Sequence, residues 1–435
     1  MNIAIIGAGW AGCAAAVEAT RLGHKVTLFE AARTPGGRAR RLDITQGDHT
    51  LVLDNGQHIL IGAYVQTLRL MADVGIDTTA ALLRLPLNLT FPDGQGFKLP
   101  AFRWLPAPLD ALVGILTARG WSWGDKLSLL RASVGWQLRQ FSCAPGLSVF
   151  DVSAGVSARV MATLIEPLCV SALNTPPERA CGQVFLRVLR DALFASSGAS
   201  NLLLPTTDLS ALLPDAALSW LVQAGGQLQV GCRVNALKRN GHQWALGLDS
   251  PLDSHEASVA FDQVILACPP LEAARLAAQA GPSAQLWVDQ ARGLQHEAIA
   301  TVYALAPGVR LAQPMLALRA NPCMPAQYVF DRGQLGGPAG LLAFVVSASQ
   351  GSHADITRQV TAQAAEQLGL HTLQVLQTVV EKRATFACTP SLVRPAARVT
   401  EGLMACGDYL AGPYPATLEG AVRSGLEAAQ RLGTQ

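Results

Sequence analysis

The sequence is poor in charged residues, and this excludes several classes of protein. Asp, Glu, Lys and Arg make up 15% of the 435 residues, and the formal net charge is only +2. So small a net charge gives no reason to expect nucleic acid as a partner. The chain also lacks a run of about 18 uncharged apolar residues, so no membrane-spanning helix is expected.

Cysteine pairs are a second absence, because none of the nine cysteines stands in C-x-x-C spacing. We expect free thiols, no zinc or other metal site, and a cytoplasmic protein. A signal peptide is not expected either, because the first motif begins at Ile3 and leaves no room for a basic leading segment. Hydrophobic residues, in contrast, make up 50% of the chain, and the mean hydropathy is +0.27. Without a membrane span, this favours a large apolar pocket, a face that contacts a membrane surface, or both.

The first thirty residues contain the most specific pattern. An apolar run, residues 3–6, leads into G-x-G-x-x-G at Gly7, Gly9 and Gly12, and an Ala-rich helix follows. A second apolar run then stops at Glu30. Strand, tight turn, helix, strand and acid stand in the order that a dinucleotide-binding βαβ unit requires. The glycines would let the backbone approach a pyrophosphate at a helix N-terminus, and Glu30 would accept hydrogen bonds from a ribose.

Two further segments are candidates for ligand contact. Gly36-Gly37-Arg38 follows the predicted ribose-binding acid, in a loop whose backbone can press close to a ligand, and Arg38 would face a cofactor phosphate or the flavin region. A strand at 51–53 then ends at Asp54, with Gln57 and His58 just beyond it. Ligands of doubly wound folds collect at the carboxyl ends of strands, so these three are candidate pocket residues. For His58, a hydrogen-bonded structural role is an equal alternative.

The middle of the chain predicts a helical region. Trp121, Trp123 and Trp136 are interleaved with cations such as Lys126 and Arg131. Tryptophan beside cations on an apolar segment is typical of a helix that lies in a membrane interface. A buried helical subdomain that roofs a pocket is the alternative, and we favour it, because tryptophan and arginine stems also pack well inside proteins. Before this region, leucines alternate from Leu83 to Leu89 as in one strand.

The second half of the chain predicts two sheets. Four short β segments suggest a small antiparallel meander: 228–230, 234–237, 244–248 and 257–261. Residues 264–267 look like a parallel strand that returns to the nucleotide-binding sheet. The β-like stretches between 297 and 387, with a helix at 354–368, predict an antiparallel sheet whose apolar strands would wall a substrate cavity.

The C-terminus returns to the first domain. A short strand leads into Cys406-Gly407-Asp408, and Asp408 at a strand end suits a polyol hydroxyl such as ribityl. A small-residue-rich helix then begins with Leu418-Glu419-Gly420-Ala421. The backbone at Gly420 and Ala421 suits an electron-rich carbonyl, because a helix N-terminus favours negative charge.

Together these residues resemble the FAD-dependent amine oxidase and phytoene desaturase superfamily over nearly the whole chain. The segment from Asp54 to Tyr64, Asp-Asn-Gly-Gln-His-Ile-Leu-Ile-Gly-Ala-Tyr, is similar to that of its squalene-associated branch, the hydroxysqualene dehydroxylases. The resemblance implies an α/β fold: a Rossmann-like FAD-binding domain with a parallel sheet and a β-meander, interleaved with a substrate domain of antiparallel sheet plus helices. The FAD-binding domain would comprise residues 1–80, 205–285 and 394–435. The substrate domain would comprise 81–204, its helical and potentially membrane-facing part, and 286–393.

FAD is the cofactor that the resemblance implies. The residues expected to bind it are Gly7, Ala8, Gly9, Ala11, Gly12, Glu30, Gly36, Gly37, Arg38, Val234, Ala267, Gly407, Asp408, Leu418, Gly420 and Ala421.

The resemblance also implies a reaction, the reductive removal of a hydroxyl group from hydroxysqualene to give squalene, upstream of hopanoids. FAD must first be reduced by an external reductant. Hydroxide is a poor leaving group, so an acid must protonate it, and the strand-end position predicts His58 or Asp54 for that catalytic role. The apolar pocket would keep out water. Peripheral contact with the inner face of the plasma membrane stays open.

Three other functions compete with this one. A carotenoid desaturase of the same fold would pass hydride the other way, to FAD. A flavin-free prenyl-binding protein, as in Rab GDP-dissociation inhibitors, would not need Glu30 or Asp408. Amine or protoporphyrinogen oxidation would want a more polar pocket.

Overall fold

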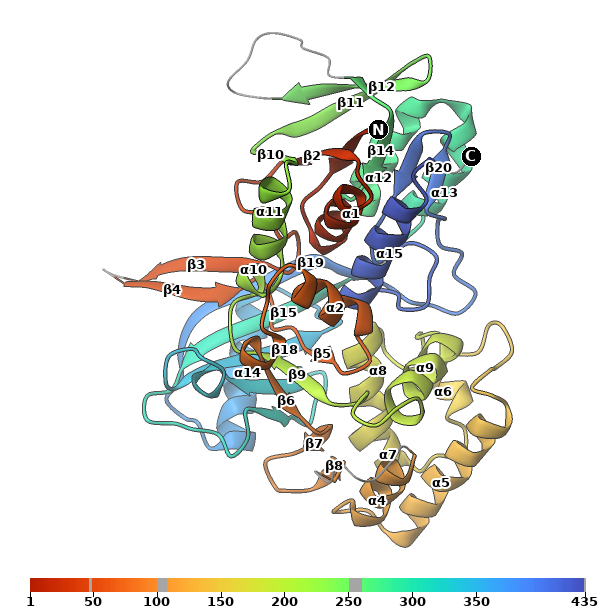
Figure 1. Ribbon diagram of the computed structural model, residues 1–435. Coiled ribbons are helices and arrows are strands. Elements are labelled where there is room, and N and C mark those ends of the chain that lie inside the picture. The colour runs from red at the N-terminus through yellow and green to blue at the C-terminus, as the bar shows by residue number, and fades with distance from the viewer. Residues whose placement is uncertain (47–48, 101–107, 250–259, 434–435) are drawn as a thin grey trace.

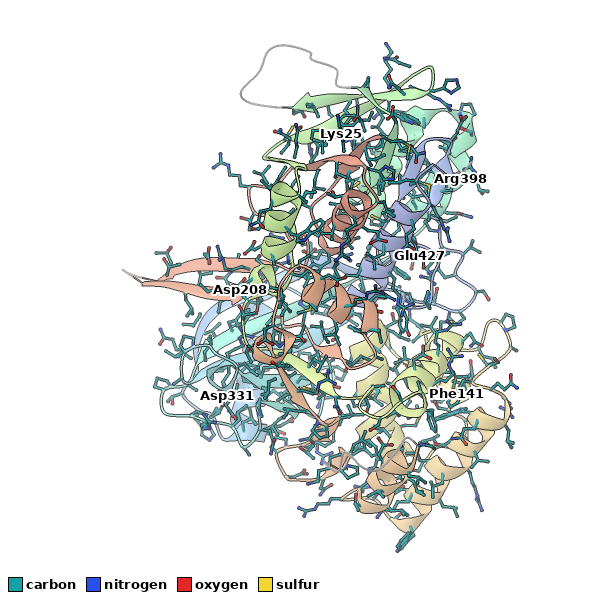
Figure 2. All side chains as sticks on the ribbon, viewed as in Figure 1. Lys25, Phe141, Asp208, Asp331, Arg398 and Glu427 are labelled. Atoms are coloured by element: carbon teal, nitrogen blue, oxygen red, sulfur yellow. The ribbon has the colours of Figure 1, made fainter. Side chains whose placement is uncertain are left out.

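The computed structural model describes residues 1–46, 49–100, 108–249 and 260–433 (Figure 1). Figure 1 shows three regions: a sheet with its helices at the top, a second sheet at the lower left, and a group of helices at the lower right. In Figure 2, Lys25 and Arg398 lie in the first region, Asp331 in the second and Phe141 in the third.

The first region is built on a six-stranded sheet in the order β10-β2-β1-β14-β21-β20. The strands pair in parallel except for β20, which runs antiparallel to β21. Three separate stretches of the chain supply them. In chain order they are β1 (Asn2–Ile6), β2 (Lys25–Glu30), β10 (Gln227–Val230), β14 (Gln263–Leu266), β20 (Arg398–Thr400) and β21 (Leu403–Ala405).

Helices cover this sheet, as the continuous apolar runs of parallel strands require. The helix after the glycine motif, α1 (Trp10–Arg21), packs against α15 (Leu418–Gln430) and α11 (Pro214–Gln223). At the crossing of α1 and α15, a Cβ on Gly425 would lie 2.2 Å from the carbonyl oxygen of Ala11. The two helices can approach this closely only because residue 425 is glycine, and the contact fixes the end of the chain against the N-terminal motif. The remaining helices of this region are α10 (Leu209–Leu212), α12 (Pro270–Ala277) and α13 (Gln285–Arg292).

The predicted four-stranded meander is wrong in its first strand. Residues Gln227–Val230 form β10, which pairs in parallel with β2 at the edge of the six-stranded sheet. The antiparallel meander has three strands: β11 (Arg233–Asn240), β12 (Gln243–Asp249) and β13 (Ala260–Phe261). A four-residue strand, here Gln-Leu-Gln-Val, is too short to reveal which sheet it joins, and this explains the error. The predicted residues 257–259 lie outside the described residues. The strand that returns to the nucleotide-binding sheet is confirmed as β14, beside β1.

The second region is a five-stranded antiparallel sheet in the order β16-β17-β18-β15-β19. Alternate residues of β15 lie in different cores. Ala300 and Val302 pack in the core that includes residues of α14, whereas Tyr303 belongs to the large core shared with the helical region. The bounds are β15 (His296–Leu305), β16 (Met315–Ala317), β17 (Tyr328–Asp331), β18 (Leu341–Ser347), β19 (Gln374–Phe386) and α14 (His353–Leu368). This confirms the predicted antiparallel sheet and its helix.

The third region, the helical lobe, is formed by residues 109–194. Trp121 and Trp136 are buried in it, as the subdomain alternative predicts, but Trp123 is exposed. Its helices are α4 (Leu109–Thr117), α5 (Trp123–Leu138), α6 (Val149–Val152), α7 (Ala158–Val160), α8 (Glu166–Leu173) and α9 (Gly182–Leu189), with π-helical turns at Met161–Ile165 and Arg190–Phe194. None of the described helices is both long enough and apolar enough to cross a membrane.

Short strands connect these regions. The alternating leucines 83–89 do not form one strand. The first strand ends at Leu85, and the residues from 88 onward belong to a strand of a different sheet. The small sheets are β3 (Arg41–Gln46) with β4 (His49–Asp54), β5 (Leu60–Ile61) and β6 (Leu82–Leu85) with β9 (Leu202–Pro205), and β7 (Asn88–Thr90) with β8 (Gly96–Lys98). Two helices, α2 (Val65–Asp73) and α3 (Thr78–Ala81), complete this part.

Candidate flavin and substrate site

The glycine turn between β1 and α1 is shaped by close backbone contacts. Gly7 has φ +112°, and a Cβ there would lie 2.7 Å from the carbonyl oxygen of Ala267. A Cβ on Gly12 would lie 1.9 Å from the carbonyl oxygen of Gly7. Gly9 is different, because its φ is −77° and a Cβ there would have the Cα of Gly37 as its nearest atom, at 3.8 Å. Gly7 and Gly12 therefore close the turn, while Gly9 leaves room for a ligand to approach the backbone.

The N-terminus of α1 has no side chain that would compete with an anion. Gly9 is its N-cap residue, no side chain caps it, and its first turn contains no acid. The first N–H groups of a helix lack partners within the helix, and the helix dipole favours negative charge near them. Ala8 and Ala11, both predicted to bind the cofactor, are buried on either side of Gly9. The arrangement fits a pyrophosphate.

Glu30 lies at the end of β2, beside the glycine turn. Its Oε2 accepts a hydrogen bond from the Ala8 N–H at 2.7 Å, and its Oε1 accepts one from the Ala32 N–H at 2.8 Å. An ionised carboxylate has about four acceptor positions. Two therefore remain for ribose hydroxyls. The backbone carbonyl of Glu30 also accepts the N–H of Cys232, which brings the start of β11 and the predicted residue Val234 close to this acid.

The second glycine pair meets the first turn directly. Gly36 forms a parallel bridge with Gly9, and its N–H donates to the Ala8 carbonyl at 2.8 Å. A Cβ on Gly37 would lie 3.2 Å from the Cα of Gly9. The next residue, Arg38, then reaches the C-terminal segment, since its Nη2 lies 2.5 Å from Oδ1 of Asp408. The structure thus joins both predicted loops and the predicted strand-end acid.

The C-terminal segment folds around Asp408. A small cavity is lined by Gly407, Asp408 and Gly420, among other residues, so the strand end and the start of α15 lie together. The N–H groups of Gly420 and Ala421 are used by the helix cap, because they donate to Oγ1 and the carbonyl of Thr417 respectively. Leu418 packs, half-buried, on the core of the first region. The predicted contact between this helix start and a flavin carbonyl stays a prediction.

Asp54 is buried at the end of β4. Its Oδ1 accepts the Leu209 N–H at 2.8 Å, and its Oδ2 lies 3.7 Å from Nη2 of Arg332. Burial raises the pKa of Asp54 to about 6. The Tyr303 hydroxyl donates to the Asp54 carbonyl oxygen at 3.0 Å, and Arg332 donates to the side chain of Gln57. Asp54 therefore links β15 and the segment after β17 to the glycine-turn region, and its carboxyl group loses its proton nearer to neutral pH than an ordinary aspartate does.

His58 lies two residues beyond Gly56, near Arg38. Its Nδ1 is 2.9 Å from the Gly56 carbonyl oxygen. Burial and the nearby Arg38 cation lower the pKa of His58, so the ring is neutral at neutral pH. Only a protonated ring nitrogen can bond to a carbonyl, so we assign the proton to Nδ1, and Nε2 is then an acceptor. In this state His58 can accept a hydrogen bond at Nε2, and the proton-donor role predicted for His58 or Asp54 stays a prediction.

Three side chains at this site were not predicted from the sequence. Thr301 on β15 is buried, and its Oγ1 has no hydrogen-bond partner among the described residues. A Cβ on Gly56 would lie 3.9 Å from that Oγ1 and 3.7 Å from Cε1 of His58, so both side chains flank Gly56. The other two are Tyr303, which donates to the Asp54 carbonyl, and Arg332, which lies beside the Asp54 carboxylate. A threonine or tyrosine inside a β-like run gives no sequence signal of such a role.

Glu419 has a structural role that the sequence did not reveal. Its carboxylate is fully buried and accepts the N–H groups of Gln66 and Thr67 and the Thr67 hydroxyl, at the start of α2. Arg423 donates to it at 2.6 Å. A residue of α15 thus caps α2, a helix that lacks a capping side chain of its own.

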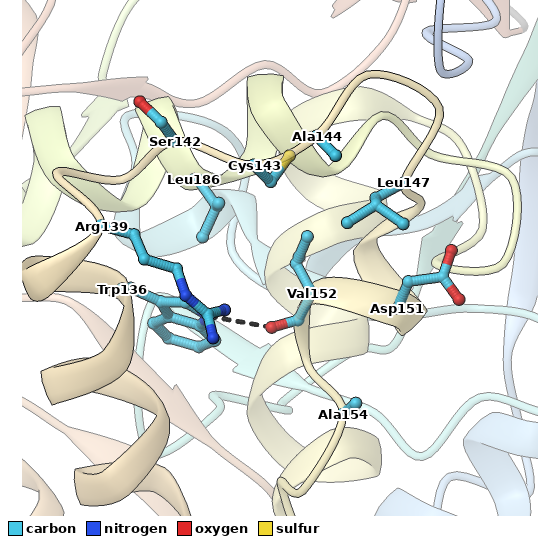
Figure 3. Close-up of a pocket in the computed structure, with 10 residues that line it drawn as sticks. All are labelled: Trp136, Arg139, Ser142, Cys143, Ala144, Leu147, Asp151, Val152, Ala154 and Leu186. Atoms are coloured by element: carbon cyan, nitrogen blue, oxygen red, sulfur yellow. Dashed lines mark hydrogen bonds between the residues drawn. The ribbon is translucent and has the colours of Figure 1, made fainter.

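A separate cavity of about 530 Å³ lies in the helical lobe. Figure 3 shows its lining, which includes Trp136, Arg139, Leu147 and Val152 and none of the predicted site residues. The indole N–H of Trp136 donates to the Val152 carbonyl at 2.9 Å and fixes one wall (Figure 3).

Comparison with known proteins agrees with this geometry. The family described as "Flavin containing amine oxidoreductase" matches residues 10–433. The chain is 29% identical to hydroxysqualene dehydroxylase of Rhodopseudomonas palustris and 26% identical to that of Sinorhizobium fredii, in each case over 98% of this chain and 97% of the relative. It is 33% identical to zeta-carotene desaturase of a Synechocystis strain, but over only 29% of this chain and 26% of that protein.

Solved structures show the same fold. An oxidoreductase from Methanosarcina mazei superposes with a TM-score of 0.73 and 16% sequence identity, covering 99% of this chain and all of that one. This confirms the predicted fold class, and the flavin family confirms the predicted FAD cofactor.

Proposed function

We propose that this chain, which belongs to the flavin-containing amine oxidoreductase family, converts hydroxysqualene to squalene. The observation that supports this most strongly is coverage. Relatives named hydroxysqualene dehydroxylase match 97% or more of both lengths, while the carotenoid desaturases match between 18% and 62% of this chain. A protein aligned along its whole length with a relative shares its substrate domain as well as its cofactor domain.

The apolar face of the antiparallel sheet suits an isoprenoid substrate. Tyr303, Tyr328 and Phe330 are buried in the large core that joins this sheet to the helical lobe. The Tyr328 hydroxyl accepts a hydrogen bond from the Ser171 hydroxyl and donates one to the Pro167 carbonyl. Its polar group is therefore satisfied, and the rest of the ring is apolar. A substrate cavity bounded by these rings would bind a hydrocarbon chain and keep water from a carbocation.

In the proposed reaction the carbon–oxygen bond of the alcohol breaks, a carbon–hydrogen bond forms, and water leaves. The hydride would come from bound, reduced FAD, which is the two-electron donor that this reaction needs. The oxygen needs one proton to leave as water, and Asp54, whose pKa is raised to about 6, is the proposed donor. Arg332, 3.7 Å away, stabilises the carboxylate that results. His58 and Thr301 would orient the hydroxyl group near Gly56.

The experiment is a turnover assay with two arms. The purified protein is reduced with dithionite under anaerobic conditions and incubated with hydroxysqualene, and in the second arm the oxidised protein is incubated with phytoene. Squalene in the first arm alone supports the proposal. New double bonds in phytoene, with no squalene, would make the chain a desaturase instead. A colourless protein that binds a prenyl chain but no flavin would overturn both enzyme assignments.

A further inference from the structure

Seven apolar side chains of the helical lobe are exposed side by side on two helices. Trp123 is 74% exposed and Leu138 is 80% exposed, at opposite ends of α5. We call this surface the apolar ridge. Its members are Leu109, Leu112 and Leu116 of α4 and Trp123, Leu127, Val134 and Leu138 of α5.

The spacing on α5 shows that the ridge is one face of that helix. Trp123, Leu127, Val134 and Leu138 stand at positions i, i+4, i+11 and i+15, which an α-helix places within about 60° of arc. The buried residues Leu129 and Trp136 lie on the opposite side. One apolar face of α5 therefore packs in the core of the lobe. The apolar face that carries the ridge is exposed, and packing within the lobe does not explain why it is apolar.

The α4 part of the ridge lies directly beside the α5 part. The Nζ of Lys126 donates to the Leu116 carbonyl at 2.6 Å and lies 5.0 Å from the ring centre of Trp123. This single side chain ties the C-terminus of α4 to the start of α5. The α4 row therefore ends, at Leu116, next to the start of the α5 row at Trp123.

Basic residues outnumber acidic residues on and next to the two helices of the ridge. Lys126 and Arg131 lie on α5, and Arg119 precedes it. The acid of α5, Asp125, is occupied by the capping box with Ser122. Asp110 of α4 is a second acid beside the ridge, so these three cations face two acids.

We propose that the apolar ridge docks on the surface of a lipid bilayer that contains anionic lipids. An exposed tryptophan, a leucine-rich face and flanking cations are the features that bury a helix at the headgroup boundary. A second copy of the chain is a poorer occupant, because a two-fold contact would bring the same cations together. Docking depends on the ridge and not on which isoprenoid is converted.

The test is sedimentation of the full-length, flavin-loaded protein with vesicles of phosphatidylcholine, with and without phosphatidylglycerol. We expect binding to the anionic vesicles, and a roughly tenfold or greater loss of binding in a Trp123→Ser/Leu138→Ser variant. The matched control is Leu286→Ser/Val393→Ser, which removes two equally exposed apolar side chains from other surfaces and should bind as the wild type does. An Arg119→Gln/Arg131→Gln variant should lose only the preference for the anionic vesicles.

A second readout is independent of sedimentation. Brominated lipids should quench part of the tryptophan fluorescence of the wild type, and Trp123→Phe should abolish that part. Flavin content and melting temperature verify that each variant is folded. The proposal is overturned by absence of vesicle binding, by equal losses in ridge and control variants, or by a lipid-free dimer that the ridge variant dissociates.

Discussion

Arg38 and Asp408 form an ion pair at 2.5 Å, although they stand 370 positions apart in the chain. The Asp408 side chain is nearly buried and the Arg38 side chain is about one-third exposed. Arg38 also donates to the Ala384 carbonyl at 2.6 Å, at the end of the antiparallel sheet. One guanidinium therefore connects the N-terminal glycine loop, the C-terminal strand end and the second sheet at the predicted flavin site.

Removing the Arg38–Asp408 pair should weaken flavin binding more than it weakens the fold. Asp408→Asn keeps the size of the side chain but loses the charge that orients Arg38, and a charge-assisted hydrogen bond of this kind corresponds to roughly 10- to 100-fold in affinity. Flavin fluorescence titration of the apoprotein measures the dissociation constant. The control is Asp43→Asn, which disrupts the exposed Arg41–Asp43 pair. Equal affinity in both variants would contradict a role for Asp408 in the flavin site.

Gly9 and Gly12 should respond differently to the same substitution. Gly9→Ala fits the backbone, because φ is −77° and the nearest atom is 3.8 Å away, so the apoprotein should keep its stability within about 0.5 kcal/mol. The added methyl group would occupy the space proposed for the pyrophosphate, and flavin affinity should fall roughly tenfold or more. Gly12→Ala, with a contact of 1.9 Å, should instead destabilise the apoprotein by more than about 2 kcal/mol. Chemical denaturation and flavin titration separate the two effects. Unchanged flavin binding by Gly9→Ala would remove this turn from the site.

The predictions that succeeded from sequence depend on local patterns. The βαβ unit is confirmed because its strand, glycines, helix and acid all fall within thirty residues, where spacing alone determines the geometry. The β10 strand was placed wrongly because its four residues carry no information about their partner. Pairing across the chain needs the assembled fold, so the sequence indicated Arg38 and Asp408 separately but not their contact. The same holds for Glu419, whose partners at 66 and 67 are over 350 positions away.

Glu419 should contribute to stability rather than to chemistry. Glu419→Ala would leave the first N–H groups of α2 without their acceptor and Arg423 without its carboxylate, at a cost of about 3 kcal/mol in the free energy of unfolding. The control is Glu427→Ala on the exposed face of the same helix, with an expected cost below about 1 kcal/mol. Urea denaturation of both apoproteins measures the difference. A cost below about 1 kcal/mol for Glu419→Ala would contradict the capping role.

The ionisation of Asp54 should leave a signature in both stability and turnover. Its pKa rises from an ordinary 3.8 to about 6 in the folded state. Protonated Asp54 therefore contributes fully to the free energy of unfolding below about pH 4, and this contribution is lost as the pH rises through 6. The stability of Asp54→Asn relative to the wild type should therefore increase across this window, by up to about 3 kcal/mol. The control variant is Asp43→Asn, which removes an exposed carboxyl group.

The same Asp54 proton predicts the pH profile of catalysis. Turnover by the reduced wild type should decline above about pH 6, because the deprotonated carboxyl group cannot supply the proton that the leaving oxygen needs. Asp54→Asn should lose most turnover while keeping its flavin. If Asp54→Asn and His58→Gln both retain wild-type turnover with flavin bound, neither residue is the acid.

Thr301 should be a residue whose hydroxyl group favours function over stability. Its Oγ1 is buried and has no partner among the described residues, so Thr301→Val removes a hydroxyl that forms no hydrogen bond there and should leave stability unchanged or raise it by about 1 kcal/mol. The matched control is Thr385→Val on β19, where the hydroxyl accepts the Asn174 amide at 2.9 Å and its loss should lower stability.

If the Thr301 hydroxyl binds the substrate oxygen beside Gly56, Thr301→Val should bind flavin normally yet turn over at least roughly tenfold more slowly, with Thr301→Ser retaining most activity. Thermal denaturation and anaerobic turnover give the two readouts. A variant that is both as stable and as active as the wild type would show that the hydroxyl has no role in the reaction, and a variant less stable than the Thr385→Val control would show that it is bonded in the folded protein after all.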